Sequence, residues 1–456
     1  MTLAVRRCLP SLFLSLIAAG CGDDIPGDSA DEIGSEESSS STTADESGSE
    51  SMDSSSDTGS DTETGSDTMV LCDPGDPSAL EHEFLPPGSS RSGVTLSACD
   101  YHIWWVSAAD GVETTISVTP GMAVDIAVSY PDDPSFVDNL ASATLYQPGG
   151  LSFESPRSGE FAVLVRAQNP GNDPLLTLDY DISVACSNQC QFETTRFPIV
   201  MVHGWTGFEN IGPLTYFYNV REDLEALGYP IAVPILDPYN SVDIRGEQLA
   251  DFVGNALSAQ RARKVNLLGH SQGGIDSRYV AAEAGGGYGG QVGAVITLGT
   301  PHQGTPFTDI ALGLIPGPTE QVLVWLLNFL GAAQSQQSDV EASLYTLSET
   351  FMQGEFNSTY VDDPRVKYWS WMGHTCVGGI GCQDVLDPLL LFSYELIPGD
   401  NDGLVPEESA KWGEFLGLIP ADHIDQIGQI GGLTSPNYDH IQFFRDNARM
   451  LRDNEF

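Results

Sequence analysis

The stretch Val265-Asn266-Leu267-Leu268-Gly269-His270-Ser271-Gln272-Gly273 is the most informative part of the 456-residue sequence. Residues 265–268 have the pattern of a short buried strand, and residues 273–284 have the pattern of a helix. A glycine two positions before and two positions after a serine permits the tight turn that places the hydroxyl clear of a sheet, at the positive end of a helix. The stretch therefore predicts a nucleophile elbow centred on Ser271.

Strands and helices alternate on both sides of this elbow. Apolar runs predict strands at 197–203, 231–235, 265–268, 292–298 and 366–371, and helical spacing predicts helices at 214–227, 243–260, 273–284 and 440–451. Alternation of this kind is typical of a mostly parallel sheet flanked by helices. The sequence therefore predicts an α/β domain over residues 195–456.

A serine is a weak nucleophile unless a histidine, oriented by an acid, removes its proton, and after an elbow of this type the acid and then the histidine follow along the chain. Asp402 lies in a short polar loop and His423 follows it. The other histidines after the elbow fit less well: His302 is too near, His374 precedes the acid candidates, and His440 begins the last helix. Each residue alone would be an ordinary loop residue, but together Ser271, Asp402 and His423 form a candidate triad.

Two backbone N–H groups are needed where negative charge develops on the substrate oxygen during attack by the serine. The N–H of Gln272 directly follows the candidate nucleophile, and the N–H of Trp205 lies in the loop after the first strand of the α/β domain. These two groups are the predicted oxyanion hole.

The first 71 residues have the composition of a targeting segment and a tether. Residues 1–20 contain Arg6, Arg7 and a short apolar run, which predicts a signal peptide, and the sequence before Cys21 resembles a lipobox, so that Cys21 would carry a lipid. An ordinary secretory signal with an incidental cysteine is the alternative. Residues 21–71 are predicted to be a disordered acidic linker, because positions 23–70 contain 15 acidic residues and no aromatic residue. We expect an exported protein, held on the cell envelope or surface by its lipid, or secreted.

Residues 72–190 consist of short alternating runs between turn residues, which predicts a smaller, all-β sandwich domain. Trp104 and Trp105 could face a ligand, although the sequence favours one in the core and the other partly exposed. Six cysteines outside the targeting segment are an even number, which in an oxidising compartment favours disulfides. Proximity suggests the pairs Cys72–Cys99, Cys186–Cys190 and Cys376–Cys382.

The charge balance argues against a nucleic-acid partner. The chain has 18 basic and 64 acidic residues, a formal net charge of −46, whereas phosphate binding needs a basic surface.

Several segments resemble the Pseudomonas- and Burkholderia-type bacterial triacylglycerol lipases. The similarity is nearly continuous over residues 197–302 and returns in patches toward the C-terminus; it includes Phe208-Glu209-Asn210-Ile211-Gly212-Pro213-Leu214, Arg245-Gly246-Glu247-Gln248-Leu249 and Asn401-Asp402-Gly403-Leu404-Val405. This resemblance implies an α/β-hydrolase fold and an ester-hydrolysing enzyme, with Ser271, Asp402 and His423 as its triad. It also makes a folding chaperone a candidate partner.

The same resemblance implies a structural calcium ion, Ca2+, near the catalytic histidine. Asp387 and Asp425 match side-chain ligands, and Gln429 and Leu433 match positions that contribute backbone carbonyls. Oxygen ligands suit calcium, which could fix the loop that carries His423. The sequence departs from the family at the glycine-rich segment 428–432, which affects the two carbonyl positions most.

Residues 319–333 are apolar on nearly every face and are predicted to form a lid over the serine, with a buried core helix as the alternative. The sequence thus predicts a lipase acting on triacylglycerols. A short-chain carboxylesterase or a polyester depolymerase could use the same triad, and a surface adhesion protein with an inactive hydrolase domain is the alternative from another class.

Overall fold

The computed structural model describes residues 81–133, 135–169, 173, 175–205, 210–211, 214–323, 339–374, 387–429 and 431–456. The predicted signal peptide, Cys21, the acidic linker, Cys72, the pair Cys376–Cys382 and most of the predicted lid lie outside these residues. Within them, no helix has both the length and the apolar character needed to cross a lipid bilayer.

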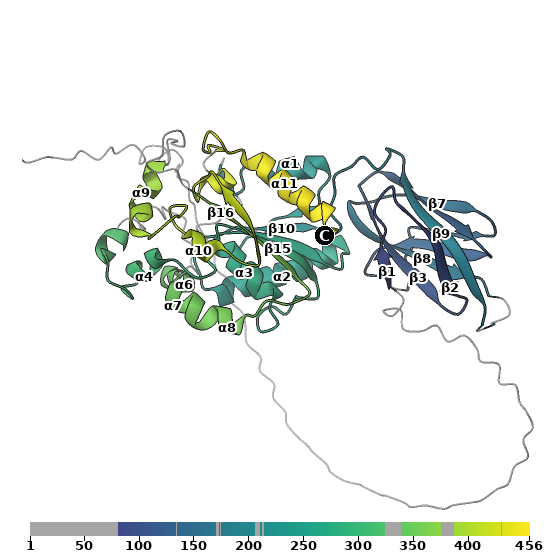
Figure 1. Cartoon of the computed structure of the whole chain (residues 1–456), viewed down its shortest axis with the longest axis horizontal. Coiled ribbons are helices and arrows are strands. Elements are labelled where there is room, and N and C mark those ends of the chain that lie inside the picture. Colours follow the sequence, from purple (N-terminus) through teal and green to yellow (C-terminus); the bar gives the residue numbers. More distant parts are fainter. Residues whose placement is uncertain are drawn as a thin grey trace, which may run out of the picture. The chain divides into compact units, whose positions relative to one another are not determined.

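Nine strands form two facing sheets in the first part of the described chain (Figure 1). The strands are β1 (Glu81–Phe84), β2 (Ser90–Ser97), β3 (Tyr101–Ala108), β4 (Glu113–Pro120), β5 (Val124–Ser129), β6 (Ala141–Leu145), β7 (Gly149–Glu154), β8 (Gly159–Ala167) and β9 (Thr177–Cys186). One sheet has the order β1-β3-β8-β5-β6 and the other β2-β9-β4-β7, and all pairings except the parallel β1–β3 are antiparallel. The predicted all-β sandwich is therefore present.

Neither tryptophan of β3 is available to a ligand. Trp104 is 1% exposed and donates its Nε1–H to the Tyr180 hydroxyl at 2.8 Å, and Trp105 is 5% exposed. The prediction that one of them is partly exposed is wrong, because β3 is an inner strand and its outer face is covered by a second apolar cluster that includes Trp105 and Phe136.

Six parallel strands form the central sheet of the second part. They are β10 (Ile199–Val202), β13 (Ile231–Ala232), β14 (Val265–His270), β15 (Val292–Leu298), β16 (Lys367–Gly373) and β17 (Glu414–Ile419), in the order β13-β10-β14-β15-β16-β17. The helices are α1 (Val220–Leu227), α2 (Val242–Gln260), α3 (Gln272–Ala281), α4 (Pro306–Ala311), α6 (Val340–Thr346), α7 (Glu349–Phe351), α8 (Asn357–Thr359), α9 (Asp387–Leu396), α10 (Glu407–Ala410) and α11 (His440–Asp453), with a π-helix at Met352–Phe356 and a 3-10 helix at Asp425–Ile427.

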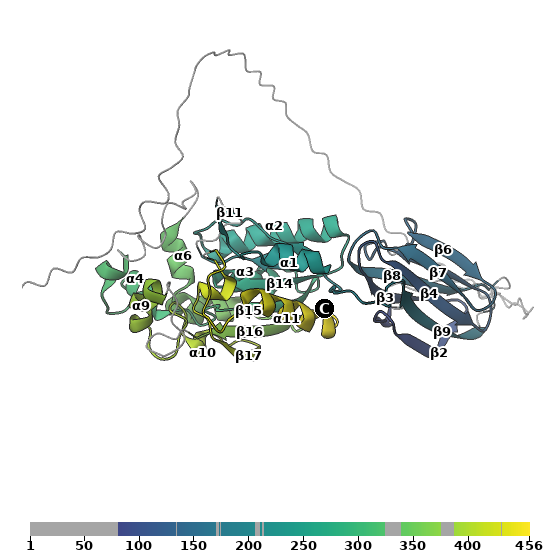
Figure 2. The same ribbon diagram turned by 90° about the horizontal axis from the view of Figure 1, so that it is seen from above.

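Helices cover both faces of this sheet, as the alternation of its side chains requires (Figures 1 and 2). Ile199 and Met201 of β10 pack in the core shared with α1 and α11, whereas Val200 and Val202 pack in the core shared with α2 and α3. This topology confirms the predicted α/β-hydrolase class. The sheet is parallel and covered by helices on both faces, and the turn from β14 into α3 at Ser271 starts from an inner strand of that sheet.

The predicted helix at 214–227 is wrong in its first half. Leu214–Thr215 is strand β12, which pairs with β11 (Asn210–Ile211), and α1 begins only at Val220. The residue before the helix, Asn219, has φ 55°, so the backbone is left-handed there and a continuous helix is impossible.

Glu160 in β8 ties the β-sandwich to the α/β part. Its side chain is buried and pairs with Arg196 at 2.5 Å and with Arg263 at 2.8 Å, and the Arg263 guanidinium lies 3.6 Å from the Trp105 ring centroid. The backbone N–H of Arg196 donates to the carbonyl of Phe456 at 2.9 Å. The predicted disulfide Cys186–Cys190 closes the end of β9, and Cys99 is also disulfide-bonded.

Candidate active site

The turn at Ser271 has the strained geometry of a nucleophile elbow. Ser271 has φ 56° and ψ −130°, between the end of β14 and the start of α3, and its N–H donates to the Leu298 carbonyl at 2.9 Å. A Cβ on Gly273 would lie 2.3 Å from the Val202 carbonyl oxygen, and one on Gly269 would lie 2.6 Å from the backbone of Gly273. Only glycine fits at these two positions, which explains the motif physically.

Asp402 and His423 meet although 20 residues separate them. The distance from His423 Nδ1 to Asp402 Oδ2 is 2.8 Å, and the Asp402 carboxylate is fully buried. Its Oδ1 accepts the N–H groups of Leu404 and Val405 at 3.0 and 2.8 Å, so the acid is fixed by its own loop. This arrangement lets Asp402 orient the imidazole by accepting the proton on Nδ1 as a hydrogen bond.

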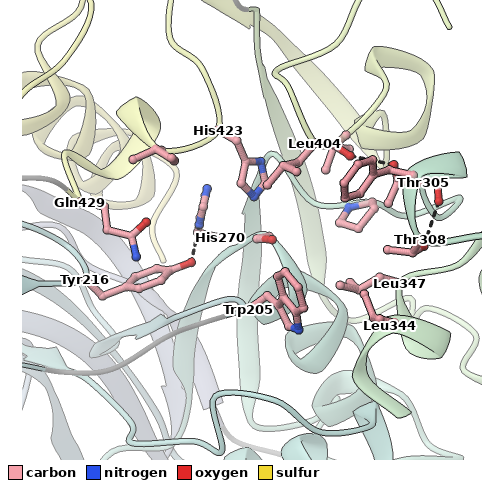
Figure 3. Close-up of a pocket in the computed structure, with 15 residues that line it drawn as sticks. Trp205, Tyr216, His270, Thr305, Thr308, Leu344, Leu347, Leu404, His423 and Gln429 are labelled. Carbon is pink, nitrogen blue, oxygen red and sulfur yellow. Dashed lines mark hydrogen bonds between the residues drawn. The ribbon is translucent and has the colours of Figure 1, made fainter. Parts of the chain in front are cut away.

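Ser271 and His423 line the same pocket, which is shown in Figure 3. The His270 ring lies against the His423 ring with centroids 4.6 Å apart. Burial, followed by the charge of His423, lowers the pKa of His270 well below its ordinary value, so His270 is neutral. With this ring neutral, His423 could gain a proton without a second positive charge in contact with it.

The loop after β10 passes directly beside the nucleophile. A Cβ on Gly204 would lie 2.5 Å from the Ser271 Cβ. The Gly204 N–H donates to the Tyr216 hydroxyl at 2.9 Å, and that hydroxyl is 2.7 Å from His270 Nδ1, a contact visible in Figure 3. The Tyr216 hydroxyl therefore links the Gly204 N–H to the His270 ring.

The two predicted oxyanion donors belong to segments that adjoin Ser271: Trp205 follows Gly204 in the loop beside the serine, and Gln272 is the first residue of α3. The Gln272 side chain donates to the Asn240 carbonyl at 2.9 Å and accepts from Ser343 at 3.2 Å, which holds the first residue of α3 in place.

Most of the pocket surface is apolar. Its lining comes from the end of β14 and its elbow, from the segments after β10, β12, β15, β16 and β17, and from α4 and α6. It consists of Trp205, Tyr216, His270, Ser271, Pro301, Thr305, Phe307, Thr308, Leu344, Leu347, Leu404, Val405, His423, Ile424 and Gln429. Thr305 and Thr308 direct their hydroxyls to carbonyls, of Leu404 and Thr305 respectively, rather than leaving them unpaired. A chain of CH2 groups would therefore be the suitable occupant.

The predicted calcium ligands are only partly described. Asp425 is fully buried in the 3-10 helix that follows His423, and its Oδ2 accepts the Ser435 N–H at 2.8 Å. Gln429 lines the pocket, Leu433 is half exposed, and Asp387 begins α9, its side chain being outside the description. In the part of the chain that the structure describes, no group of three His, Cys, Asp or Glu side chains could hold a metal ion. The buried carboxylate of Asp425 is a ligand type that suits calcium.

The sequence did not identify Gln426, which contacts Asp402. Gln426 donates its Nε2–H to Asp402 Oδ2 at 2.8 Å, the same oxygen that contacts His423. The only signal was its position three residues after His423, about one helical turn away. His302, by contrast, is buried against Trp412 and contacts Thr297 Oγ1 at 3.0 Å, outside the pocket lining.

Comparison with known proteins gives a consistent picture for part of the chain. No protein-family model matches it. It is 31% identical over 292 residues to a triacylglycerol lipase of Vibrio cholerae, a match covering 58% of this chain and 90% of the relative. It is 29% identical over 317 residues to a triacylglycerol lipase of Burkholderia plantarii, covering 57% and 87%. A solved structure of a Bacillus licheniformis lipase in mature form is 26% identical, with a TM-score of 0.42, and the match covers 56% of this chain and 91% of that one.

Proposed function

Because the chain belongs to the triacylglycerol lipase family, we propose that it hydrolyses lipid esters through an acyl-enzyme on Ser271. The 2.8 Å contact between His423 Nδ1 and Asp402 Oδ2, at a pocket that Ser271 also lines, is the observation that carries the proposal. The apolar pocket supports a substrate with a hydrocarbon acyl chain.

The chemistry follows from this arrangement. His423 Nε2 takes the proton from Ser271 Oγ as that oxygen attacks the ester carbonyl carbon, and the carbonyl oxygen becomes an oxyanion held by the N–H groups of Trp205 and Gln272. The protonated His423 then gives its proton to the leaving alcohol, and the acyl group stays on Ser271. Water, deprotonated by His423, attacks the acyl carbon. The protonated His423 then returns this proton to Ser271 Oγ as the bond between that oxygen and the acyl carbon breaks, and the acid leaves. Asp402 keeps the imidazole in the required tautomer throughout.

Replacing the nucleophile tests the mechanism. Ser271→Ala should lower the hydrolysis of p-nitrophenyl palmitate by at least about 10⁴-fold, because no other group can form the acyl-enzyme. The exposed serine variant Ser358→Ala is the matched control and should retain full activity. Retained activity in Ser271→Ala, with wild-type stability, would contradict the assignment.

The substrate range is tested with esters of increasing chain length. A lipase should prefer palmitate over butyrate esters and gain activity once the substrate forms an emulsion. Preference for butyrate without that gain would instead favour the short-chain carboxylesterase, and release of monomers from an aliphatic polyester would favour the depolymerase.

We also propose a structural calcium ion held by the side chains of Asp387 and Asp425 and by the carbonyls of Gln429 and Leu433. When bound, it would supply positive charge that stabilises the buried Asp425 and the segment that carries His423. At a free concentration 100 times Kd it would add about 2.7 kcal/mol to the free energy of unfolding. EDTA should therefore lower the melting temperature of the wild type, and added calcium should restore it.

Two variants separate this site from a general salt effect. Asp425→Asn should melt at the same temperature with and without EDTA, whereas the exposed Asp453→Asn should respond as the wild type does. A wild-type melting temperature indifferent to both EDTA and calcium would exclude the proposed ion.

We further propose that the chain is exported and anchored by a lipid on Cys21. The basic and apolar segment before Cys21 and the acidic segment after it support this assignment. Cys21→Ser should move the protein from the membrane fraction to the soluble fraction and remove the lipid mass from its N-terminal peptide, whereas Cys8→Ser should change neither. Refolding of the pure chain to full activity would show that no folding chaperone is required.

A further inference from the structure

A fully buried ion pair lies behind the catalytic serine. Arg245 of α2 and Asp276 of α3 are both 0% exposed, and the Arg245 Nε and Nη2 atoms lie 2.9 and 2.8 Å from Asp276 Oδ2. Removing two charges from water is unfavourable, and an apolar pair of the same size is often at least as stable. The ion pair is therefore poorly explained by a need to hold α2 against α3.

The remaining donors of Arg245 reach the loop beside the nucleophile. Its Nη2–H donates to the His203 carbonyl at 2.7 Å, and its Nη1–H donates to the Asp237 carbonyl. Among the described residues, the hydrogen bonds of the Asp276 side chain go to Arg245, so Asp276 reaches that loop through the guanidinium. The pair thus connects the helix that follows Ser271 to the backbone that precedes Trp205.

The contacts on His203 and Gly204 fix two successive peptide groups. In the first, Arg245 holds the His203 carbonyl, and the Tyr216 hydroxyl accepts the Gly204 N–H at 2.9 Å. In the second, His203 Nδ1 lies 3.1 Å from the Gly204 carbonyl oxygen. The His203 Nε2 atom accepts the Leu236 N–H at 3.1 Å, so the ring proton is on Nδ1 and is donated to Gly204.

The direction of the Trp205 N–H follows from these contacts. In a trans peptide the C=O and the N–H point in opposite directions. Since the Gly204 carbonyl is held by the His203 ring, the Trp205 N–H must point away from that ring. Losing the contact from Arg245 would leave the first peptide held at its N–H end alone, free to rotate and to change the direction of the second.

We propose that Asp276 is a positioning residue for the oxyanion loop: it holds the Arg245 guanidinium on the His203 carbonyl and so fixes the direction of the Trp205 N–H. This inference rests on the proposed function, in which Trp205 stabilises the oxyanion. Because the oxyanion exists in the transition state and not in the bound ester, the effect of Asp276 falls on kcat rather than on KM.

The test compares two ways of weakening the contact between α2 and α3. Asp276→Asn should lower kcat for p-nitrophenyl butyrate by about 10- to 100-fold and leave KM within about twofold, because losing an oxyanion donor outright costs about 10²–10³-fold. Tyr279→Phe removes the 2.6 Å hydrogen bond from Tyr279 to Glu247, which also joins α3 to α2 but does not touch the loop. That variant should lose stability and keep kcat.

A double variant keeps the test decisive if Asp276→Asn folds poorly. Arg245→Met with Asp276→Leu replaces the pair by apolar side chains and should recover most of the melting temperature, yet kcat should stay low. Affinity for a trifluoromethyl ketone, which forms an oxyanion on Ser271, should fall in parallel with kcat.

Two outcomes would overturn the inference: wild-type kcat in a folded Asp276→Asn, or full recovery of kcat with stability in the double variant. If the wild type itself fails to hydrolyse the ester, or Ser271→Ala hydrolyses it normally, the proposed function fails instead, so the two failures can be told apart.

Discussion

Three buried histidines, His203, His270 and His302, are held neutral in the α/β part. Burial, followed by the charge of Arg245, lowers the pKa of His203 to about 3, and burial also lowers the pKa values of His270 and His302 well below their ordinary range. An unfolded histidine titrates near pH 6.5. Below that pH the unfolded chain binds protons that the folded chain does not, so stability decreases as the pH falls.

The free energy of unfolding should therefore decrease from pH 7 to pH 5. At pH 5 the neutral His203 alone costs about 2 kcal/mol, because pH 5 is about 1.5 units below the unfolded pKa. Protonation of Asp276 has the opposite effect on stability. Burial raises its pKa to about 6, so below that pH the folded state binds a proton that the unfolded state does not yet bind. Three histidines outweigh this one group. Urea denaturation at pH 5, 6 and 7 measures the slope.

His302→Gln is the control for this slope. It removes one of the three titrating side chains outside the pocket lining and should flatten the decrease between pH 7 and pH 5. A stability independent of pH over this interval would show that the three rings are not held neutral.

At the scale of single residues, the order of residues along the chain identified the candidate triad but not the residues that contact it. The order of acid and histidine after the elbow was enough to choose Asp402 and His423, and the structure places their side chains 2.8 Å apart. Gln426, Tyr216 and Arg245 could not be selected in this way, because their contacts depend on which loops meet in space. The catalytic roles themselves stay predictions until the variants are measured.

At the scale of elements, the two glycines of the elbow connect the motif to the packing of β10 and α3. Gly273→Ala should lower the free energy of unfolding by about 3 kcal/mol and abolish activity, because the new Cβ would lie 2.3 Å from the Val202 carbonyl oxygen of the neighbouring strand. Urea denaturation and ester hydrolysis together check this expectation.

The matched control is a glycine in the π-helix. A Cβ on Gly354 would meet nothing within 4 Å, and its φ is not positive, so Gly354→Ala should leave activity unchanged and stabilise by up to about 1 kcal/mol. Equal effects of the two substitutions would contradict the packing argument for the elbow.

Strand β17 is not among the strands expected from the sequence. It contains Gly417, which has φ 135° and lies opposite Trp371, next to a register shift in the pairing with β16. A glycine in this conformation interrupts the apolar run by which the other strands are recognised.

At the scale of the whole molecule, several of the few basic residues gather around one buried carboxylate. The chain has 18 basic residues against 64 acidic ones, and two of its arginines, Arg196 and Arg263, pair with the buried Glu160. The Arg157 guanidinium donates to the Glu160 carbonyl at 2.9 Å. Glu160 is thus a buried anion of the sandwich that is shared by two arginines of the α/β part.

Glu160→Gln should lower the free energy of unfolding by about 2 kcal/mol, because it leaves two arginines, each partly buried, without their carboxylate. The exposed pair of Glu83 and Arg91 provides the control, and Glu83→Gln should change stability by less than about 0.5 kcal/mol. Urea denaturation of both variants measures the difference. Equal small effects would show that Glu160 is not a structural anion.

The hydrogen bond from the Arg196 N–H to the Phe456 carbonyl has a consequence for how this catalytic region can be rebuilt. Residues 196 and 456 are in contact, so the first and last residues of the α/β part lie next to each other. A short linker could join these two points, and the joined chain could be opened at an exposed turn such as the one at Gly287. Circular permutants of this kind would keep Ser271, Asp402 and His423 in one pocket while changing their order along the chain.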